Sequence, residues 1–214
     1  MRRIKYQSKG KQTTLPIKDE KEIARIVQYL LVRRDKAKKA GHMKRYLTYY
    51  RNYMLFMCGV NLAFRAEDLL QLRVNDLIEG YVQIKENKTG KSQIFPLNKS
   101  FLEGIKKYVE VMGLTPHEYM FPSQRPGVIG AITRQQADRI MWDVKKNCKI
   151  RYTFAMHSLR KTFGYMYYKN GGKLLTLQKM YNHDDPSTTL RYIMWDDNDV
   201  QKERKTIYIG GNIK

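Results

Sequence analysis

The hydrophobic pattern of this chain changes its period once, and that change limits the folds the chain can adopt. Over most of the sequence, apolar residues recur at helical spacing. At 81–85 they alternate instead, and a second strand-like run at 92–97 follows the turn at 87–90. A further strand is expected near 74–77. The sequence therefore predicts a mainly α fold with a small antiparallel β-sheet of two or three strands, an α+β fold class.

Helices are expected on both sides of this sheet. The first opens at Pro16 and Asp19 and ends at Gly41, and the second covers 43–60. Tyrosine and methionine recur along the second helix at helical spacing, and we assign this stripe to the core rather than to a stacking platform. The remaining helices are predicted at 65–72, 100–112, 133–147, 157–170, 174–181, 186–194 and 199–207.

The charge of the chain points to a polyanionic partner. The 214 residues include 41 Lys and Arg against 20 Asp and Glu, a net formal charge of +21. Because such an excess repels itself in the folded state, nucleic acid is the first candidate partner and an anionic membrane surface the second. No run approaches the ~18 apolar residues of a spanning helix, and the N-terminus is no signal peptide. We therefore expect a cytoplasmic, nucleoid-associated protein without a membrane partner.

Neither a metal nor a cofactor is indicated. The two cysteines, Cys58 and Cys148, lie in apparently helical and partly apolar segments. We expect both to be reduced, buried or half-buried thiols of a cytosolic protein. Because no Cys and His cluster has metal-ligand spacing, the sequence predicts no zinc site and no cofactor.

Composition divides the chain into three parts. Residues 1–14 are expected to form a flexible basic arm, either a solvated tail or a clamp on a nucleic-acid backbone. Residues 15–198 form one mainly helical domain. The segment 199–214 is too short to form a core alone, so its apolar side must pack on its own domain or on a neighbouring copy.

A few residues could carry chemistry, although each has a plainer interpretation when taken alone. An Arg at a helix start or a Lys in a turn is usually a solvated charge, and a Tyr on a helix is usually core. His157 and Arg160 lie one helical turn apart at a helix start, so they can address one anionic ligand together. The candidates are Arg65, Lys88, His157, Arg160, His183 and Tyr192.

Together these side chains match the needs of phosphoryl transfer from DNA to a phenol. Catalysis of that reaction consists mostly of positioning and of stabilising charge on the non-bridging oxygens, which guanidinium groups suit well. A lysine can protonate the departing sugar oxygen, and histidines can hydrogen-bond the phosphate and help take the phenolic proton. Because the protein supplies the cations, this chemistry needs no metal.

This ordered set resembles the catalytic domain of the tyrosine recombinase, or phage integrase, family. The box His-Ser-Leu-Arg at 157–160 matches closely, and His183 precedes Tyr192 by nine positions (192 − 183), as in the family's terminal box. The segment 65–72 is similar to the family's Arg-x-x-Glu-Leu-x-x-Leu helix, and 88–97 is similar to its β-hairpin. The resemblance covers about residues 15–195.

Three positions depart from the family pattern without losing a catalytic group. Asp68 stands where Glu is usual, and Asn182 replaces a common Gly but can also adopt a left-handed turn. The Gly that usually precedes the first Arg is replaced by Ala-Phe at 63–64. The family's N-terminal core-binding domain is not found, so we expect either a truncated chain or one of the short family members.

The resemblance implies a role for each candidate residue. Residues 15–198 would be a tyrosine recombinase catalytic domain. Lys88 would be the general acid, Tyr192 would become the 3′-phosphotyrosine, and His157 would also assist proton transfer. The residues implied to hold the scissile phosphate are Arg65, His157, Arg160 and His183.

The implied function is site-specific recombination of double-stranded DNA, as by an integrase or invertase. The protein would be a monomer in solution and a homotetramer on paired DNA sites, with 199–214 docked on the adjacent protomer. A type IB topoisomerase, which shares the chemistry, and a basic DNA-binding regulator without catalysis are the alternatives. An RNA-binding protein would explain the charge but not the motifs.

Overall fold

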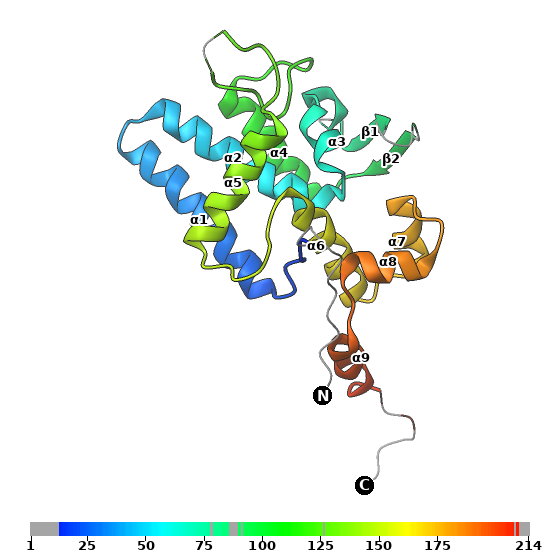
Figure 1. Ribbon diagram of the computed structural model, residues 1–214. Coiled ribbons are helices and arrows are strands. Elements are labelled where there is room, and N and C mark those ends of the chain that lie inside the picture. The colour runs from blue at the N-terminus through cyan, green and yellow to red at the C-terminus, as the bar shows by residue number, and fades with distance from the viewer. Residues whose placement is uncertain are drawn as a thin grey trace.

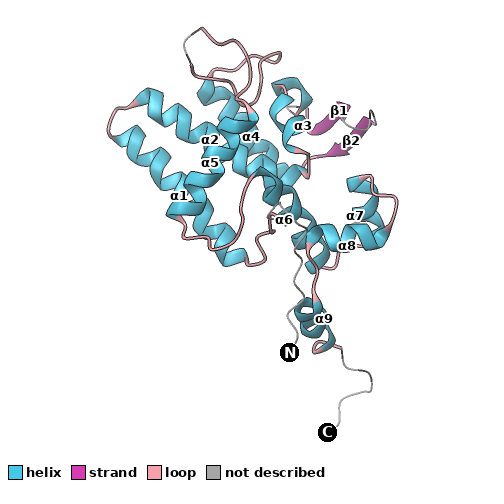
Figure 2. Cartoon of the chain, in the orientation of Figure 1, coloured by secondary structure: helices cyan, strands magenta, loops and turns pink. Residues whose placement is uncertain are grey.

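The computed structural model describes residues 13–77, 79–85, 90, 92–125, 127–207 and 209. In this part of the chain helices dominate, and two strands form a hairpin at one edge (Figure 1, Figure 2). The predicted fold class is confirmed. The elements are α1 (Glu20–Lys39), α2 (Met43–Leu62), α3 (Ala66–Gln71), β1 (Tyr81–Lys85), β2 (Ser92–Pro96), α4 (Lys99–Met112), α5 (Arg134–Asn147), α6 (Met156–Lys169), α7 (Leu174–Tyr181), α8 (Pro186–Ile193) and α9 (Asp197–Arg204).

Helices α1 and α2 form an antiparallel hairpin that packs against α4 and α5 (Figure 1). The side chain of Asp19 caps α1 by accepting a hydrogen bond from the backbone N–H of Lys21, which satisfies one of the free donors of the first turn. The tyrosine stripe of α2 lies in the core, as predicted. The ring of Tyr50 packs edge-on against Tyr108 of α4, with centroids 5.3 Å apart.

The prediction of a strand at 74–77 is wrong, because these residues form a short 3₁₀ helix, Val74–Asp76. The Asp76 carboxylate accepts a hydrogen bond from the backbone N–H of Arg73 at 2.7 Å, which closes the turn. The backbone N–H of Val74 then bonds the carbonyl of Glu118 at 3.0 Å instead of joining the sheet. Within the described residues the sheet is therefore the two-stranded hairpin β1–β2, with Val82 opposite Phe95.

Helix α6 joins the two halves of the molecule. Its first half contributes Met156 and Leu159 to the main core, and Tyr165 in its second half belongs to a smaller cluster with α7 and α8. The crossing with α2 is close, because a Cβ placed on Gly59 would lie 2.4 Å from Leu159 Cδ1. Glycine at position 59 lets the backbone of α2 approach α6, and this contact fixes the start of α6.

Other expectations have mixed outcomes. Cys58 and Cys148 are buried free thiols, as expected, and burial raises the pKa of the Cys58 thiol. None of the helices in the described ranges is long and apolar enough to cross a membrane. The last helix begins at Asp197 and not at 199, because Asp196 accepts hydrogen bonds from the following backbone N–H groups. Most of the predicted arm, 1–12, lies outside the described residues.

Candidate active site

Four separate segments supply the described candidate residues. Arg65 is the residue immediately before α3. His157 and Arg160 lie near the start of α6 on one face, as their spacing predicts. His183 follows the end of α7, and Tyr192 is the penultimate residue of α8. The catalytic assignment therefore depends on whether the fold brings these segments together.

The fold brings all five to one cavity of about 430 Å³. The residues that line it are Arg65, His157, Arg160, Asn182, His183, Asp184, Asp185, Thr188 and Tyr192. Lys88, the sixth predicted residue, lies outside the described residues, although the strands that flank its turn are described. Residues distant in sequence but of complementary chemistry thus share one polar pocket, which is the usual sign of a functional site.

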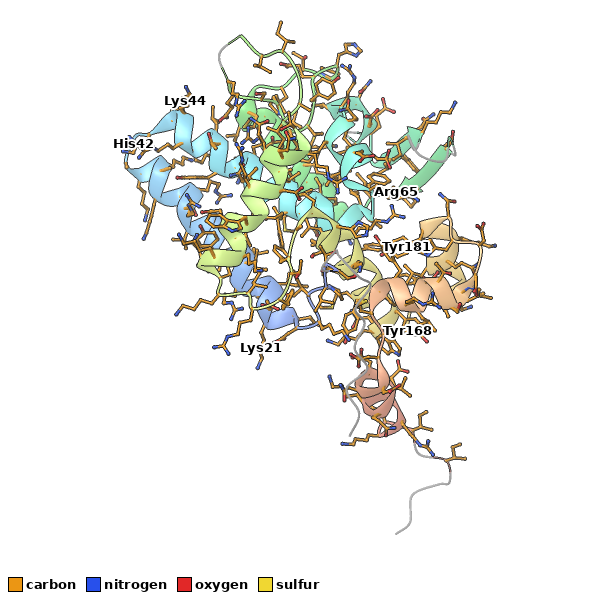
Figure 3. All side chains as sticks on the ribbon, viewed as in Figure 1. Lys21, His42, Lys44, Arg65, Tyr168 and Tyr181 are labelled. Carbon is orange, nitrogen blue, oxygen red and sulfur yellow. The ribbon has the colours of Figure 1, made fainter. Side chains whose placement is uncertain are left out.

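Arg160 is the most buried cation of the site, with 2% of its surface exposed. Its Nη2 donates to the backbone carbonyl of Tyr181 at 3.3 Å, and its guanidinium lies 4.6 Å from the centroid of the Tyr181 ring. Its Nη1 is buried and has no hydrogen-bond partner among the described residues. Because buried donors are rarely left unpaired, this nitrogen is suited to receive an oxygen of a bound anion. Figure 3 labels Arg65, just before α3, and Tyr181, at the end of α7.

Tyr192 and His157 face each other across the site. The Tyr192 hydroxyl oxygen lies 3.5 Å from Nδ1 of His157, and their rings meet edge-to-face with centroids 5.2 Å apart. Burial, together with the positive charges of Lys161 and Arg160, lowers the pKa of His157 to about 4. The imidazole is therefore neutral near pH 7, and a neutral imidazole can accept a proton.

Burial raises the pKa of Tyr192 to about 12, although Arg160 and Arg65 oppose this shift. The phenol is therefore protonated in the free protein near neutral pH, so it needs a base to become a strong nucleophile. The same two arginines favour the phenolate and lie in the same cavity. The site thus combines a protonated nucleophile, a neutral histidine and cations that stabilise negative charge.

His183 is oriented by the turn that precedes it. Asn182 has left-handed backbone angles, φ 54° and ψ 43°, as its replacement of a glycine predicted. Nδ1 of His183 lies 3.0 Å from the hydroxyl of Thr189, and Gln178 donates to the backbone carbonyl of His183 at 2.9 Å. Burial, then Arg160, lowers the pKa of His183. A neutral ring held through one nitrogen leaves the other free to bond a ligand.

Sequence reasoning missed three residues that hold this site together. The buried hydroxyl of Tyr181 donates to the carbonyl of Arg160 at 2.5 Å, and buried Thr189 orients a histidine. Lys161 is also buried, with Nζ 5.4 Å from the centroid of the Tyr192 ring. Thr189 could have been found from its place in the terminal box. Tyr181 could not, because it is one of 16 tyrosines and no pattern separates it from the others.

The described residues contain no group of three His, Cys, Asp or Glu side chains that could hold a metal ion. Two guanidinium groups, two neutral imidazoles and one phenol instead share the cavity. Such an arrangement can bind a phosphate diester, remove a proton from the phenol and stabilise the charge that develops on phosphorus oxygens. The mainly helical fold with its small sheet and this cavity define the class: a tyrosine recombinase catalytic domain.

Comparison with known proteins agrees with this class. The sequence profile of the Phage integrase family matches residues 30–199, so the chain belongs to the phage integrase family. It is 33% identical over 191 residues to the probable integrase/recombinase YoeC of Bacillus subtilis (strain 168), covering 89% of this chain and 94% of that protein. It is 29% identical to a tyrosine recombinase of Pseudothermotoga lettingae, covering 83% of this chain but only 59% of that protein.

Solved structures show the same fold. XerA recombinase matches with a TM-score of 0.66 at 18% identity, over 94% of this chain and 68% of that one. XerH recombinase, bound to a palindromic difH substrate after cleavage, matches with a TM-score of 0.67 at 20% identity, over 90% of this chain and 53% of that one. The predicted fold and the family resemblance are both confirmed.

Proposed function

We propose that this family member is a site-specific DNA recombinase that cleaves and rejoins one strand at a time through Tyr192. One observation carries the proposal: the fold gathers the five described residues of the predicted catalytic set into a single cavity. Sequence similarity alone does not require this convergence, because Arg65 precedes a different helix from those that carry the histidines and the tyrosine. No observation favours a topoisomerase or a silent DNA-binding regulator.

In the proposed reaction the scissile phosphate occupies the cavity. The guanidinium groups of Arg65 and Arg160 take its non-bridging oxygens, and the unpaired Nη1 of Arg160 is the donor best placed to do so. His183 adds a hydrogen bond from its second ring nitrogen. Arg160 and His183 are preorganised by contacts with Tyr181 and Thr189, so they stabilise the charge of the transition state without rearranging.

The proton transfers follow from the same geometry. Tyr192 Oη attacks phosphorus as its proton passes to His157, whose Nδ1 lies 3.5 Å away. Burial and neighbouring cations lower the pKa of His157 to about 4 in the free protein, and the negative charge of the bound phosphate opposes that shift, which makes the imidazole a better base for this step. The bond between phosphorus and the 5′ oxygen breaks, leaving a 3′-phosphotyrosine. We assign the proton that the departing 5′ oxygen needs to Lys88. Attack of a 5′ hydroxyl on the phosphotyrosine reverses these steps and rejoins a strand.

The proposed partner is double-stranded DNA, which the net charge of +21 would attract, so the protein would act at the nucleoid. We further propose a monomer in solution and a homotetramer on paired sites, with 1–14 as a basic arm. Asp199 packs on its own domain, but beyond it Val200, Ile207 and Ile209 are exposed, which supports docking of the rest of the segment 199–214 on a neighbouring copy.

The experiment is covalent trapping on a nicked suicide duplex built from the DNA that flanks the gene. Wild-type protein should form an adduct that survives SDS, and Tyr192→Phe should form none while still binding the duplex, because it loses one hydroxyl. Tyr167→Phe is the matched control, since that ring stacks on Phe163 and lies outside the cavity. Adduct with the Tyr192→Phe variant would mean that another tyrosine is the nucleophile.

A further inference from the structure

The chain just beyond Tyr192 is held in place by a buried carboxylate. Asp199 in the first turn of α9 is 3% exposed. Its two oxygens are both engaged: Oδ1 accepts from the Tyr165 hydroxyl at 2.7 Å and Oδ2 from Lys18 Nζ at 2.6 Å. Lys18 also bonds Asp196 at 2.9 Å. We call Lys18, Tyr165 and Asp199 the C-terminal anchor.

The cation of this anchor comes from the segment that precedes α1, and that segment is itself fixed on α6. The backbone N–H of Ile17 donates to Thr162 Oγ1 at 2.8 Å, and Ile17 is buried. Lys161 of α6 donates from Nζ to the carbonyl of Thr14 at 2.8 Å. Lys18 is therefore not a loose surface lysine, because its backbone is tied to the helix that carries His157.

The ion pair between Lys18 and Asp199 is partly buried, so its loss should cost more free energy than the loss of an exposed surface pair. The side chain of Lys18 is 32% exposed, whereas that of Asp199 is 3% exposed. Removing one partner of such a pair leaves a buried charge uncompensated, which costs more than losing an exposed ion pair. Although burial opposes its charge, the Lys18 ammonium and the Tyr165 hydroxyl hold the pKa of Asp199 below its usual value.

A short and constrained connection links the anchor to Tyr192. Ile193 is fully buried, Met194 takes left-handed angles with φ 60°, and Trp195 packs edge-on against Tyr168 with centroids 4.7 Å apart. A shift of α9 is therefore transmitted to the end of α8. No anchor residue lines the active-site cavity, so an effect on cleavage would be indirect.

We propose that Lys18, Tyr165 and Asp199 are positioning residues, which fix the helix of the nucleophile in its own active site. The proposal deepens the proposed function and rests on it. In-line attack on phosphorus tolerates little displacement, and a misplacement of about 1 Å can lower a rate about 100-fold. The anchor thus joins the segment before α1 to the segment after α8 in one positioning device.

The test measures cleavage and binding separately in the full chain. Single-turnover adduct formation at saturating suicide duplex gives the rate constant, and titration of the duplex gives Kd. Asp199→Asn and Lys18→Met should each lower the rate constant about 10- to 100-fold and leave Kd unchanged. Asp197→Asn removes an exposed acid of the same helix, so it should match wild type. Lys18→Arg keeps the cation and should recover most of the rate.

A second measurement reports on the anchor directly. The chain has two tryptophans, so Trp142→Phe leaves Trp195 as its fluorophore. In that background Asp199→Asn should increase quenching of Trp195 by acrylamide. Tyr165→Phe keeps the ring packed on Trp195, so it should increase acrylamide quenching less than Asp199→Asn does. This variant replaces the charge variants in the test if one of them fails to fold. In the double variant Lys18→Met with Asp199→Asn, the fold-decrease of the rate constant should be smaller than the product of the fold-decreases in the two single variants.

The outcomes separate the two ideas. Absence of an adduct with wild type, or an adduct with Tyr192→Phe, overturns the proposed function. If wild type forms an adduct and Asp199→Asn and Lys18→Met form it equally fast or faster, although Trp195 has become accessible, the positioning role of the anchor is overturned and the proposed function stands. A rise of Kd by the same factor as the fall of the rate constant would also contradict the positioning role, because a positioning residue should alter the chemical step and not binding.

Discussion

Two regions of this molecule are held together by different interactions. The α1–α5 body has a continuous apolar core, to which most buried aliphatic and aromatic side chains belong. The α6–α9 region has a smaller apolar cluster made of Tyr165, Leu177, Tyr181 and Ile193, which Ala63 of the body joins. Yet it contains six of the eight buried polar residues among those described, namely Ser158, Arg160, Lys161, Thr162, Thr189 and Asp199.

This difference separates stability from precision. Apolar burial is strong but non-directional, so a core fixes the packing of helices more than the orientation of one polar group. Hydrogen bonds to buried charges are directional, and they surround the residues that must meet a phosphate. The body therefore supplies the platform, and the α6–α9 region sets the orientation of the nucleophile and its partners. Arg65 crosses this division, since it extends from the body into the cavity.

Removing the two arginines in turn tests this division most strongly. Arg65→Ala and Arg160→Ala should each lower the rate of adduct formation by at least ~100-fold, because each removes a preorganised charge. Arg160→Ala should also lower Tm, since it leaves the buried carbonyl of Tyr181 without a donor, a loss of about 1–3 kcal/mol. SDS gels of reactions quenched at successive times measure the rate of adduct formation, and thermal unfolding measures Tm. An unchanged Tm in Arg160→Ala would contradict the proposed division.

The proposed role of Lys88 as general acid can be compared with the phosphate-binding role of Arg160. Lys88→Ala should lower cleavage about 100-fold, and a duplex with sulfur at the 5′-bridging position should restore it, because a thiolate leaves without protonation. Arg160→Ala should not be rescued by that duplex, since its role is to hold the non-bridging oxygens. Adding EDTA should change none of these rates. Equal rescue of both variants would remove the general-acid role from Lys88.

The sequence predicted the apolar part of the structure better than the polar part. The helices of the body follow from spacing, as do the two strands of the hairpin and the core position of the tyrosine stripe. The strand at 74–77 failed because the hydrogen bond between Asp76 and the backbone of Arg73 formed a turn that periodicity does not encode. Periodicity reports which face is apolar, and it contains no information on side-chain hydrogen bonds.

The candidate site shows the same limit. Five of the predicted residues line one cavity, and motif order and spacing were enough to select them. The contacts that orient them could not be predicted, since the partner of Arg160 is a carbonyl on α7 and that of Asp199 is a lysine before α1. Such long-range pairs depend on the tertiary fold, which local patterns do not specify.

A methyl group added to each region should have opposite effects. In Gly164→Ala the new Cβ would lie 2.3 Å from Tyr181 Oη and 2.7 Å from Ile193 Cγ2, so α7 and α8 must move and stability should fall by about 1–3 kcal/mol. Gly104→Ala in α4 meets nothing within 4 Å and should gain about 0.5–1 kcal/mol through helix propensity. Urea unfolding measures both changes. Cleavage should fall in the first variant and not in the second.

The smallest expected effect is a dependence of stability on pH that comes from the α6–α9 region. The pKa of His157 is about 4 in the folded protein against an ordinary value of 6.5, because burial disfavours its charge. Between these two values the unfolded chain binds more protons than the folded one, so stability falls as the pH drops from 6.5 toward 4. Above 6.5 the ring is neutral in both states and contributes no pH dependence.

His157→Gln should remove this contribution, so the stability of the variant relative to wild type should rise as the pH falls from 7 to 5. Because the ring is only partly buried, the slope should stay well under the ~1.4 kcal/mol per pH unit that one fully linked proton gives. His42→Gln, which changes an exposed histidine of the body between α1 and α2, should run parallel to wild type. Urea titrations at several pH values measure these differences. Parallel curves for His157→Gln and wild type would show that burial does not lower the pKa of the histidine beside the nucleophile.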